Sequence, residues 1–283
     1  MRQRDLTSSE LDRYKRDGAV VIRDAVDKSW IESLIQCTKK QLNNPSVWAN
    51  DPNPNAKQNR MFTDRYLWRT NADIFAYIKD SGCARLAAQA MQSGSSRFYF
   101  DHTLVKEPNT KAATPWHQDA PYWPFSGKQI CSIWLALTPT KVETSALEFV
   151  KGSHLDDVYY LPEAFGTEGN GNDGWIAEGS KGTTGKTARC PDIEANRDQF
   201  DIIGYDLEAG DALIFSAWTL HGARGNGSSK QARMALSTRW LGDDVRWDPR
   251  PGTDPTVTQE QVCIQPGERP TDNAFFPEFW RQE

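Results

Sequence analysis

Four histidines occur in this 283-residue chain, and two of them lie in patterns that could bind a metal ion. His117 and Asp119 form an H-x-D pair, and His221 ends an apolar run that begins at Asp211. Two imidazoles and one carboxylate are the ligand set typical of a non-haem iron(II) site with open coordination positions. Arg233 follows twelve residues after His221, and its guanidinium could bind a dicarboxylate co-substrate. The sequence therefore predicts an iron site with an anion-binding arginine.

Strand periodicity explains how these residues could meet. Residues two apart in a strand point to the same face, so His117 and Asp119 could bind one ion together. Pro115 and Pro121 flank the pair, which predicts that it lies at a strand end or edge. We expect residues 211–221 to form one strand that presents its last residue, a histidine, to the same ion.

A turn sequence separates the distal histidine from the arginine. Residues 225–228 read Gly-Asn-Gly-Ser, and His221 and Arg233 are symmetric about Gly227. We therefore expect a hairpin that places His221 and Arg233 opposite each other on adjacent strands. His154 is the competing third ligand, but no arginine follows it at a matching distance, so a turn-stabilising role is favoured.

Helical patterns occupy the first third of the chain, and strand patterns occupy the rest. We predict a single domain over residues 1–283, mainly β, with a helical flank at 1–95, a β core at 96–245 and a tail at 246–283. Residues 165–191 are interpreted as a surface insertion, with a lid over a ligand as the alternative. The individual elements are predicted as helices at 7–16, 25–42 and 66–91 and strands at 19–22, 97–105, 129–137, 146–150, 211–221 and 233–241.

Composition narrows the class of protein. Hydrophobic residues make up 38% of the chain and charged residues 25%, as in soluble globular proteins. The net charge of −5 without a cluster of lysines or arginines argues against nucleic acid or membrane partners. Five widely spaced cysteines without C-x-x-C favour reduced thiols in the cytoplasm, and no signal peptide or long apolar run occurs. A homo-oligomer remains compatible with this composition.

The chain resembles the phytanoyl-CoA dioxygenase family of iron(II)- and 2-oxoglutarate-dependent oxygenases. This resemblance implies a double-stranded β-helix core, a cupin-like jelly-roll, with the N-terminal helices packed outside. The segments that carry it are Asp17-Gly-Ala-Val-Val-Ile22, Val105-Lys-Glu-Pro108, Pro115-Trp-His-Gln-Asp-Ala-Pro-Tyr-Trp-Pro124, Gly152-Ser-His154, Leu220-His-Gly-Ala223 and Arg233-Met-Ala-Leu-Ser-Thr-Arg-Trp240.

The resemblance also implies roles for single residues and cofactors. Iron(II), 2-oxoglutarate and dioxygen would take part in the reaction. Serine often stands two residues after the distal histidine in the family, whereas Ala223 stands there in this chain. Matched by position, His117, Asp119 and His221 would bind iron, Arg233 would bind the far carboxylate of 2-oxoglutarate, and Trp134 and His102 would line the co-substrate site.

The most specific expectation is hydroxylation of an unactivated C–H bond in a small molecule. Halogenating members of the family replace the carboxylate ligand with a small residue, but Asp119 is present here. Tyr122, Trp123 and Trp218 could position an apolar or cationic substrate, and Arg239 could contact an anionic one or form a buried ion pair.

Three alternatives stay open. The same iron site could catalyse desaturation, epoxidation or ring formation. A cupin-type enzyme could use zinc or manganese without 2-oxoglutarate, although it would have no need of Arg233. A non-enzymatic binding module on the same fold is the third. No segment specifies an acyl-CoA.

Overall fold

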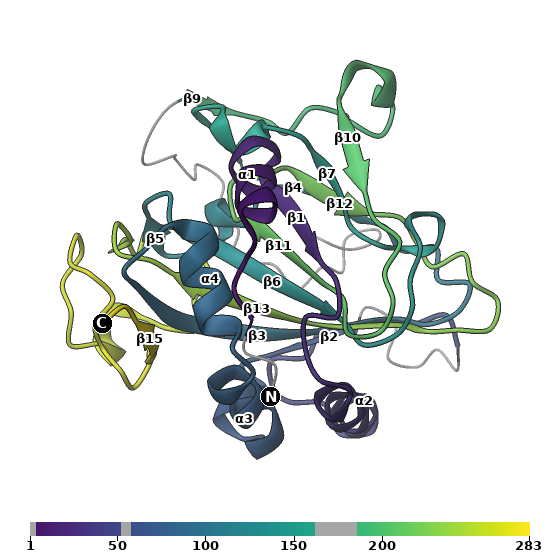
Figure 1. Ribbon diagram of the computed structural model, residues 1–283, viewed down its shortest axis with the longest axis horizontal. Coiled ribbons are helices and arrows are strands. Elements are labelled where there is room, and N and C mark those ends of the chain that lie inside the picture. The colour runs from purple at the N-terminus through teal and green to yellow at the C-terminus, as the bar shows by residue number, and fades with distance from the viewer. Residues whose placement is uncertain (1–3, 52–57, 162–185) are drawn as a thin grey trace.

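Two antiparallel sheets face each other in the computed structural model, which describes residues 4–51, 58–161 and 186–283 (Figure 1). The larger sheet has the strand order β1-β11-β6-β13-β3-β15, and β2 also pairs with β3. Its strands are β1 (Ala19–Ile22), β2 (Met61–Arg65), β3 (Ser95–Lys106), β6 (Ile130–Ala136), β11 (Ala212–Ser216), β13 (Arg233–Leu241) and β15 (Glu278–Arg281).

The smaller sheet has the order β10-β7-β12-β4. Its strands are β4 (Thr114–His117), β7 (Glu148–Val150), β10 (Ile202–Gly204) and β12 (His221–Ala223). Two short pairs lie outside both sheets: β5 (Phe125–Ser126) with β14 (Arg246–Trp247), and β8 (Val158–Tyr160) with β9 (Lys186–Ala188).

Alternation along the strands of the larger sheet separates two cores. On β11, Ile214 points outward into a cluster with the helices, whereas Phe215 points inward and packs on Phe149 of the smaller sheet, with ring centroids 5.1 Å apart. The same alternation places Ile133 outside and Trp134 inside on β6. The two sheets thus enclose an inner layer of side chains, which is the predicted double-stranded β-helix.

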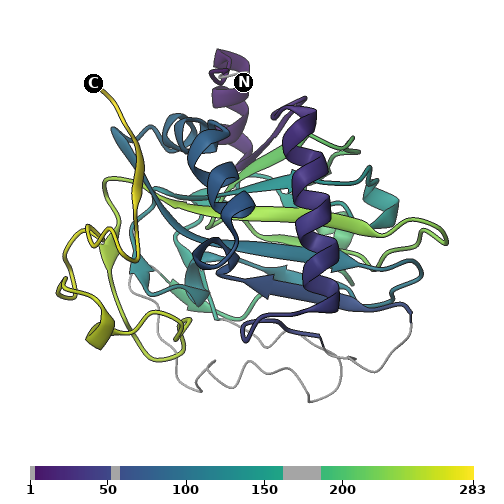
Figure 2. The same cartoon turned by 90° about the horizontal axis from the view of Figure 1, so that it is seen from below.

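Four helices cover the outer face of the larger sheet (Figure 2). They are α1 (Ser8–Asp17), α2 (Lys28–Asn43), α3 (Ala72–Asp80) and α4 (Cys83–Met91). A capping box begins α1, because Thr7 accepts from the Glu10 amide and Glu10 accepts from the Thr7 amide. The predicted helix over 66–91 is divided into α3 and α4 at Gly82, whose φ of +86° suits glycine.

The prediction of one strand over residues 211–221 was wrong. β11 ends at Ser216, and the chain turns before β12 begins at His221 in the other sheet. Thr219 stabilises this turn, since its amide donates to the Ser216 carbonyl (2.9 Å) and its hydroxyl donates to the Gly18 carbonyl (2.9 Å). A run that is apolar throughout does not reveal such a crossing, because both strands and the turn are buried.

The predicted hairpin between His221 and Arg233 was also wrong. β12 pairs with β4 and β7, whereas β13 pairs with β3 and β6. His221 and Arg233 therefore lie on different sheets rather than on paired strands of one ladder.

The segments outside the predicted β core contribute strands of their own. β2, which the sequence patterns did not predict, and β15 both pair with β3 at opposite ends of that long strand. The predicted insertion at 165–191 lies outside the described residues up to residue 185, so the alternative of a lid stays a prediction.

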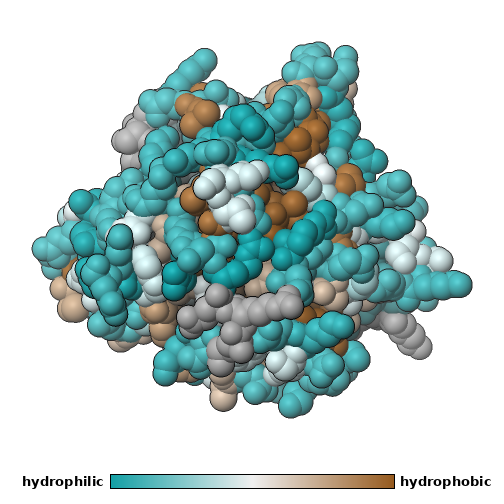
Figure 3. Space-filling model, in the orientation of Figure 1, coloured by the Kyte–Doolittle hydropathy of each residue, from teal (hydrophilic) through white to brown (hydrophobic). Residues whose placement is uncertain are grey.

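The large hydrophobic side chains that are exposed on the described surface are Val47, Trp48, Phe75 and Leu155. The face in Figure 3 is mainly hydrophilic, with hydrophobic side chains in patches separated by polar ones. Among the described residues, no helix has both the length and the apolar character needed to cross a membrane.

Candidate metal site

His117 and His221 meet at the edge of the smaller sheet. His117 is the last residue of β4, the edge strand, and His221 is the first residue of β12. The two residues are paired Cα partners, and their ring centroids lie 4.2 Å apart. The flanking prolines predicted this strand-end position for the H-x-D pair.

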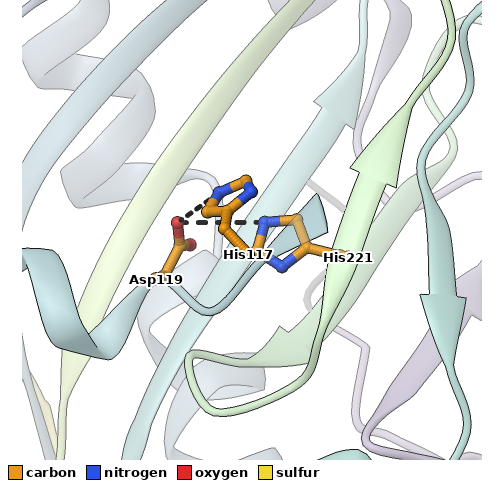
Figure 4. A group of neighbouring side chains, drawn as sticks. All are labelled: His117, Asp119 and His221. Carbon is orange, nitrogen blue, oxygen red and sulfur yellow. Dashed lines mark ion pairs between the residues drawn. The ribbon is translucent and has the colours of Figure 1, made fainter. Parts of the chain in front are cut away.

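Asp119 joins the two histidines from a turn rather than from the strand. It precedes the short 3-10 helix η2 (Ala120–Tyr122) and has helical backbone angles, so the expectation that His117 and Asp119 share a strand face was wrong. The carboxylate atom Oδ1 nevertheless lies 3.5 Å from Nε2 of His117 and 3.8 Å from Nε2 of His221 (Figure 4).

These three side chains, hereafter the His-Asp-His triad, have the geometry of a metal site. One ligand atom of each lies within 4.8 Å of the other two. Ligand atoms that share an ion at about 2.1 Å lie about 3 to 4 Å apart. The observed separations therefore leave a point between the three atoms that one ion could occupy.

Backbone carbonyls fix the orientation of both imidazoles. Nδ1 of His117 lies 2.8 Å from the Pro115 carbonyl, and Nδ1 of His221 lies 2.9 Å from the Thr219 carbonyl. Because a carbonyl only accepts, Nδ1 of each ring is the donor in these contacts, and each Nε2 is left turned toward Asp119. Burial, reinforced by His117, also lowers the pKa of His221 to about 3, so this ring is neutral near pH 7, as metal binding requires.

The Asp119 carboxylate is held in its ionised form. Its Oδ2 accepts a hydrogen bond from the Ser132 hydroxyl (3.0 Å), which leaves Oδ1 directed at the imidazoles. Burial alone would raise the pKa of Asp119, but the Arg239 guanidinium and the adjacent histidines together bring it below its usual value. Ser132 was missed in the sequence, although it lies two residues before Trp134 and so shares its inward face.

Replacing Ser132 with alanine is expected to weaken iron(II) binding by about 10-fold, the lower end of the range for partners of metal ligands. Without the hydroxyl, Asp119 loses the contact that fixes its orientation. Titration against a coloured chelator measures the affinity, and Ser9→Ala on the exposed face of α1 serves as the control. Equal affinities for the two variants would contradict this role.

Arg233 enters the inner layer from the larger sheet. Its side chain is buried, with Nη1 3.3 Å from the Leu104 carbonyl and Nη2 3.5 Å from the Ser145 hydroxyl, and Nε has no hydrogen-bond partner among the described residues. The guanidinium lies 5.7 Å from the Trp134 ring centroid. Burial lowers the pKa of Arg233 to about 10, so it stays a cation near pH 7.

A row of polar atoms crosses the inner face beside Arg233. Ser237 of β13 is the cross-strand partner of both His102 and Trp134. The Ser237 hydroxyl, His102 Nε2 and Trp134 Nε1 are buried without hydrogen-bond partners in the described part of the chain. Buried polar atoms without partners are costly, which indicates that a polar ligand belongs between the sheets.

The residues expected to contact substrate fall into two groups. Tyr122 lies edge-on to His117, with centroids 5.8 Å apart, and lines a narrow pocket beside it. Trp123 points to the inner layer, where its ring lies 5.7 Å from the Arg239 guanidinium. Trp218 instead donates its Nε1 to the Gly127 carbonyl (2.9 Å), a contact that explains its orientation without a substrate.

Arg239 is a second buried arginine on the inner face of β13. Its guanidinium also lies 5.2 Å from the Phe100 ring, and its Nε and Nη1 have no hydrogen-bond partner within the described ranges. Arg239 and Asp119 attract each other electrostatically, so the buried ion pair that the sequence left as an alternative for Arg239 stays a prediction beside the substrate contact.

His154, the competing ligand, lies in a different contact. Its Nε2 is 3.0 Å from the carbonyl of Lys15 on α1, and it is not part of the metal-capable group. The expected turn-stabilising role suits this position at the junction of the smaller sheet with α1.

Comparisons with known proteins agree with the resemblance seen in the sequence. The family model described as "Phytanoyl-CoA dioxygenase (PhyH)" matches residues 14–235, a range that includes the triad and Arg233, and this match confirms the resemblance. No curated protein sequence matches the chain.

Several solved structures share the fold. The epimerase SnoN from nogalamycin biosynthesis, in complex with Fe3+, alpha ketoglutarate and nogalamycin RO, is 21% identical, with a TM-score of 0.69 over 96% of this chain and 98% of SnoN. The carbocyclase SnoK from nogalamycin biosynthesis is 18% identical, with a TM-score of 0.70 and 96% of each chain covered. EctD from S. alaskensis, with 2-oxoglutarate and 5-hydroxyectoine, is 13% identical, with a TM-score of 0.68 over 93% of this chain and 86% of EctD. At these identities the likeness concerns the fold.

Proposed function

Because this chain belongs to the phytanoyl-CoA dioxygenase family of iron(II)- and 2-oxoglutarate-dependent oxygenases, we propose that it is a dioxygenase that hydroxylates an unactivated C–H bond of a small-molecule metabolite. Succinate and carbon dioxide are the other products. The substrate is not inferred from the family name, since no segment of the sequence specifies an acyl-CoA.

One observation carries this proposal: the His-Asp-His triad converges with both Nδ1 atoms committed to backbone carbonyls. Such an arrangement supplies three ligands on one side of an ion and leaves the other positions for co-substrate and dioxygen. Iron(II) held there supplies the dioxygen chemistry that couples decarboxylation of 2-oxoglutarate to oxidation of the substrate.

The larger sheet supplies the groups for 2-oxoglutarate. Arg233 would bind the far carboxylate, because it is a buried cation with an unpartnered Nε. Trp134 lies next to Arg233 and offers an unpartnered Nε1, and His102 offers Nε2 from the neighbouring strand. These side chains would orient the co-substrate and keep water from its keto acid end.

The substrate would enter beside His117. Tyr122 lies at the pocket there, and Trp123 continues the aromatic surface inward. Arg239 would contact a polar or anionic group of the substrate, since its charge is buried and its Nε and Nη1 lack hydrogen-bond partners in the described part of the chain. We leave Trp218 out of this group because its indole is already bound to Gly127.

Hydroxylation is the favoured outcome because Asp119 keeps the full set of three ligands. A second outcome, rearrangement of the substrate without a new hydroxyl group, is favoured by the structural likeness to an epimerase and a carbocyclase. Product analysis by mass spectrometry separates the two, since hydroxylation alone adds one oxygen atom to the substrate.

Adding iron(II) and then 2-oxoglutarate without oxygen is expected to produce a weak visible charge-transfer band. The band arises when the keto acid chelates the metal, so it needs no substrate. A screen of small molecules for succinate release then identifies the substrate. If neither iron(II) nor 2-oxoglutarate binds, the proposal is wrong, and a binding module or a different metal becomes the better account.

The cytoplasm is the proposed compartment. None of the five cysteines forms a disulfide, and three of them are buried thiols. This chemistry suits a reducing environment.

A further inference from the structure

Lys106 is a fully buried lysine that no part of the proposed function uses. It ends β3, and its Cα partner across the ladder is Arg233. Directly opposed residues of an antiparallel pair project from the same face of the sheet about 5 Å apart. Lys106 is 1% exposed and Arg233 is 4% exposed, so two cationic side chains lie together in the inner layer.

Within the described ranges, the hydrogen bonds of the Lys106 ammonium go to backbone carbonyl groups. Nζ lies 2.8 Å from the Arg224 carbonyl and 3.4 Å from the Ala223 carbonyl, and no described carboxylate forms an ion pair with it. The Arg224 carbonyl also accepts from the Ser145 hydroxyl (2.7 Å), and that hydroxyl contacts Arg233. The two cations thus share one small network that contains no negative charge.

This arrangement is unfavourable in an empty site. Burial of an unpaired charge is energetically costly, and a like charge beside it adds repulsion. Burial, and then Arg233, hold the pKa of Lys106 well below its usual value, which reflects both effects. A bound anion between the two side chains would offset both the cost of burial and the repulsion, so the pair indicates a carboxylate in the functional state.

We propose that Lys106 is a second cationic group for the distal carboxylate of 2-oxoglutarate, and that with Arg233 it makes the site selective for dicarboxylates over 2-oxo monoacids. This inference rests on the proposed function. In it, Arg233 forms the forked contact and Lys106 supplies a point charge from the adjacent strand.

The residue at position 223 of β12 lies beside this pair of cations. The family often has serine at this position, but this chain has alanine, so a hydroxyl contact to the co-substrate is missing. The Lys106 ammonium lies 3.4 Å from the Ala223 backbone carbonyl on β12. Lys106 therefore brings a hydrogen-bond donor to the strand segment that lacks the hydroxyl.

A purely structural role is the competing account. In that account Lys106 only ties β3 to β12 by donating to the two carbonyls. Glutamine at position 106 keeps N–H donors on a side chain that is one bond shorter, and it removes the charge. The variant Lys106→Gln therefore tests the charge rather than the sheet contact.

The measurement is anaerobic titration of the iron(II)-loaded protein, followed by the charge-transfer band. We expect Lys106→Gln to bind 2-oxoglutarate about 10- to 100-fold more weakly, the range for a charged hydrogen bond. The probe 2-oxopentanoate has a methyl group in place of the distal carboxylate, and its affinity is expected to be unchanged. Lys39→Gln on the exposed face of α2 is the matched control and should bind both compounds normally.

Other results would overturn the inference. Unchanged 2-oxoglutarate binding in Lys106→Gln, or an equal loss for both compounds, would assign the lysine to structure alone. If Lys106→Gln fails to fold, Lys106→Arg keeps the cation and should retain the preference for 2-oxoglutarate, so loss of the preference in a folded Lys106→Arg would count against it. If the unaltered protein binds neither iron(II) nor 2-oxoglutarate, the proposed function itself fails.

Discussion

Replacing Asp119 with alanine is expected to abolish the iron(II)–2-oxoglutarate charge-transfer band and to lower succinate release by more than about 100-fold. Changes to outer partners of metal ligands already cost up to about 100-fold, and Asp119 is proposed as a ligand itself. Its Oδ1 is the atom nearest to both imidazole Nε2 atoms, so its removal leaves two neutral ligands and no anionic one.

The fold is expected to survive this substitution. The Asp119 carboxylate accepts a hydrogen bond from Ser132, and its backbone position is held separately by the Ala120 amide, which donates to the Ala217 carbonyl (2.9 Å). The thermal unfolding midpoint of the metal-free protein should therefore change little. Asp12→Ala on the exposed face of α1 is the control, and a normal band in Asp119→Ala would remove Asp119 from the ligand set.

Local sequence signals were sufficient to predict where the H-x-D pair lies in the fold. The H-x-D pair and its flanking prolines predicted a strand end, and His117 does end the edge strand β4. This inference succeeded because it needs only neighbouring residues. The mistake about Asp119 changed little, since a turn immediately after the strand still directs the carboxylate toward His117.

The spatial relation between the H-x-D pair, His221 and Arg233 could not be predicted from local signals. The run before His221 is apolar from end to end, and burial on both sides conceals the turn at residues 217–219 where the chain crosses between sheets. Strand pairing is a long-range property, so symmetry about Gly227 predicted a hairpin that does not form. Alternation along β6 would have found Ser132, but only once Trp134 was known to point inward.

The two sheets divide the proposed chemistry between them. The smaller sheet and the turn after β4 bring together the triad, whereas the larger sheet presents Arg233, Lys106 and the row of unpartnered polar atoms. Metal binding and co-substrate binding should therefore respond to different substitutions. A site built along a single hairpin would not separate them in this way.

Arg233→Gln is the sharpest test of that separation. We expect the 2-oxoglutarate concentration for half-maximal succinate release to rise by about 100-fold or more, while iron(II) affinity stays close to that of the unaltered protein. Truncating one partner of a buried charge pair costs about 2 to 5 kcal/mol, and a factor of 100 corresponds to about 2.7 kcal/mol. Arg233 belongs to the larger sheet and contacts Leu104, Ser145 and Trp134 rather than the triad, so the metal ligands should not move.

Two titrations on the same variant show whether Arg233 acts in co-substrate binding or in metal binding. Iron(II) affinity is measured by chelator competition, and 2-oxoglutarate binding is measured through the charge-transfer band at saturating iron(II). Arg13→Gln on the exposed face of α1 controls for loss of one positive charge. Loss of iron(II) binding in Arg233→Gln would mean that the arginine supports the metal site, and unchanged 2-oxoglutarate binding would place the dicarboxylate elsewhere. If separate sheets hold the metal and the co-substrate, Arg233→Gln should lose 2-oxoglutarate binding but keep iron(II) binding. The substitution removes only the buried cation that pairs with the far carboxylate of 2-oxoglutarate.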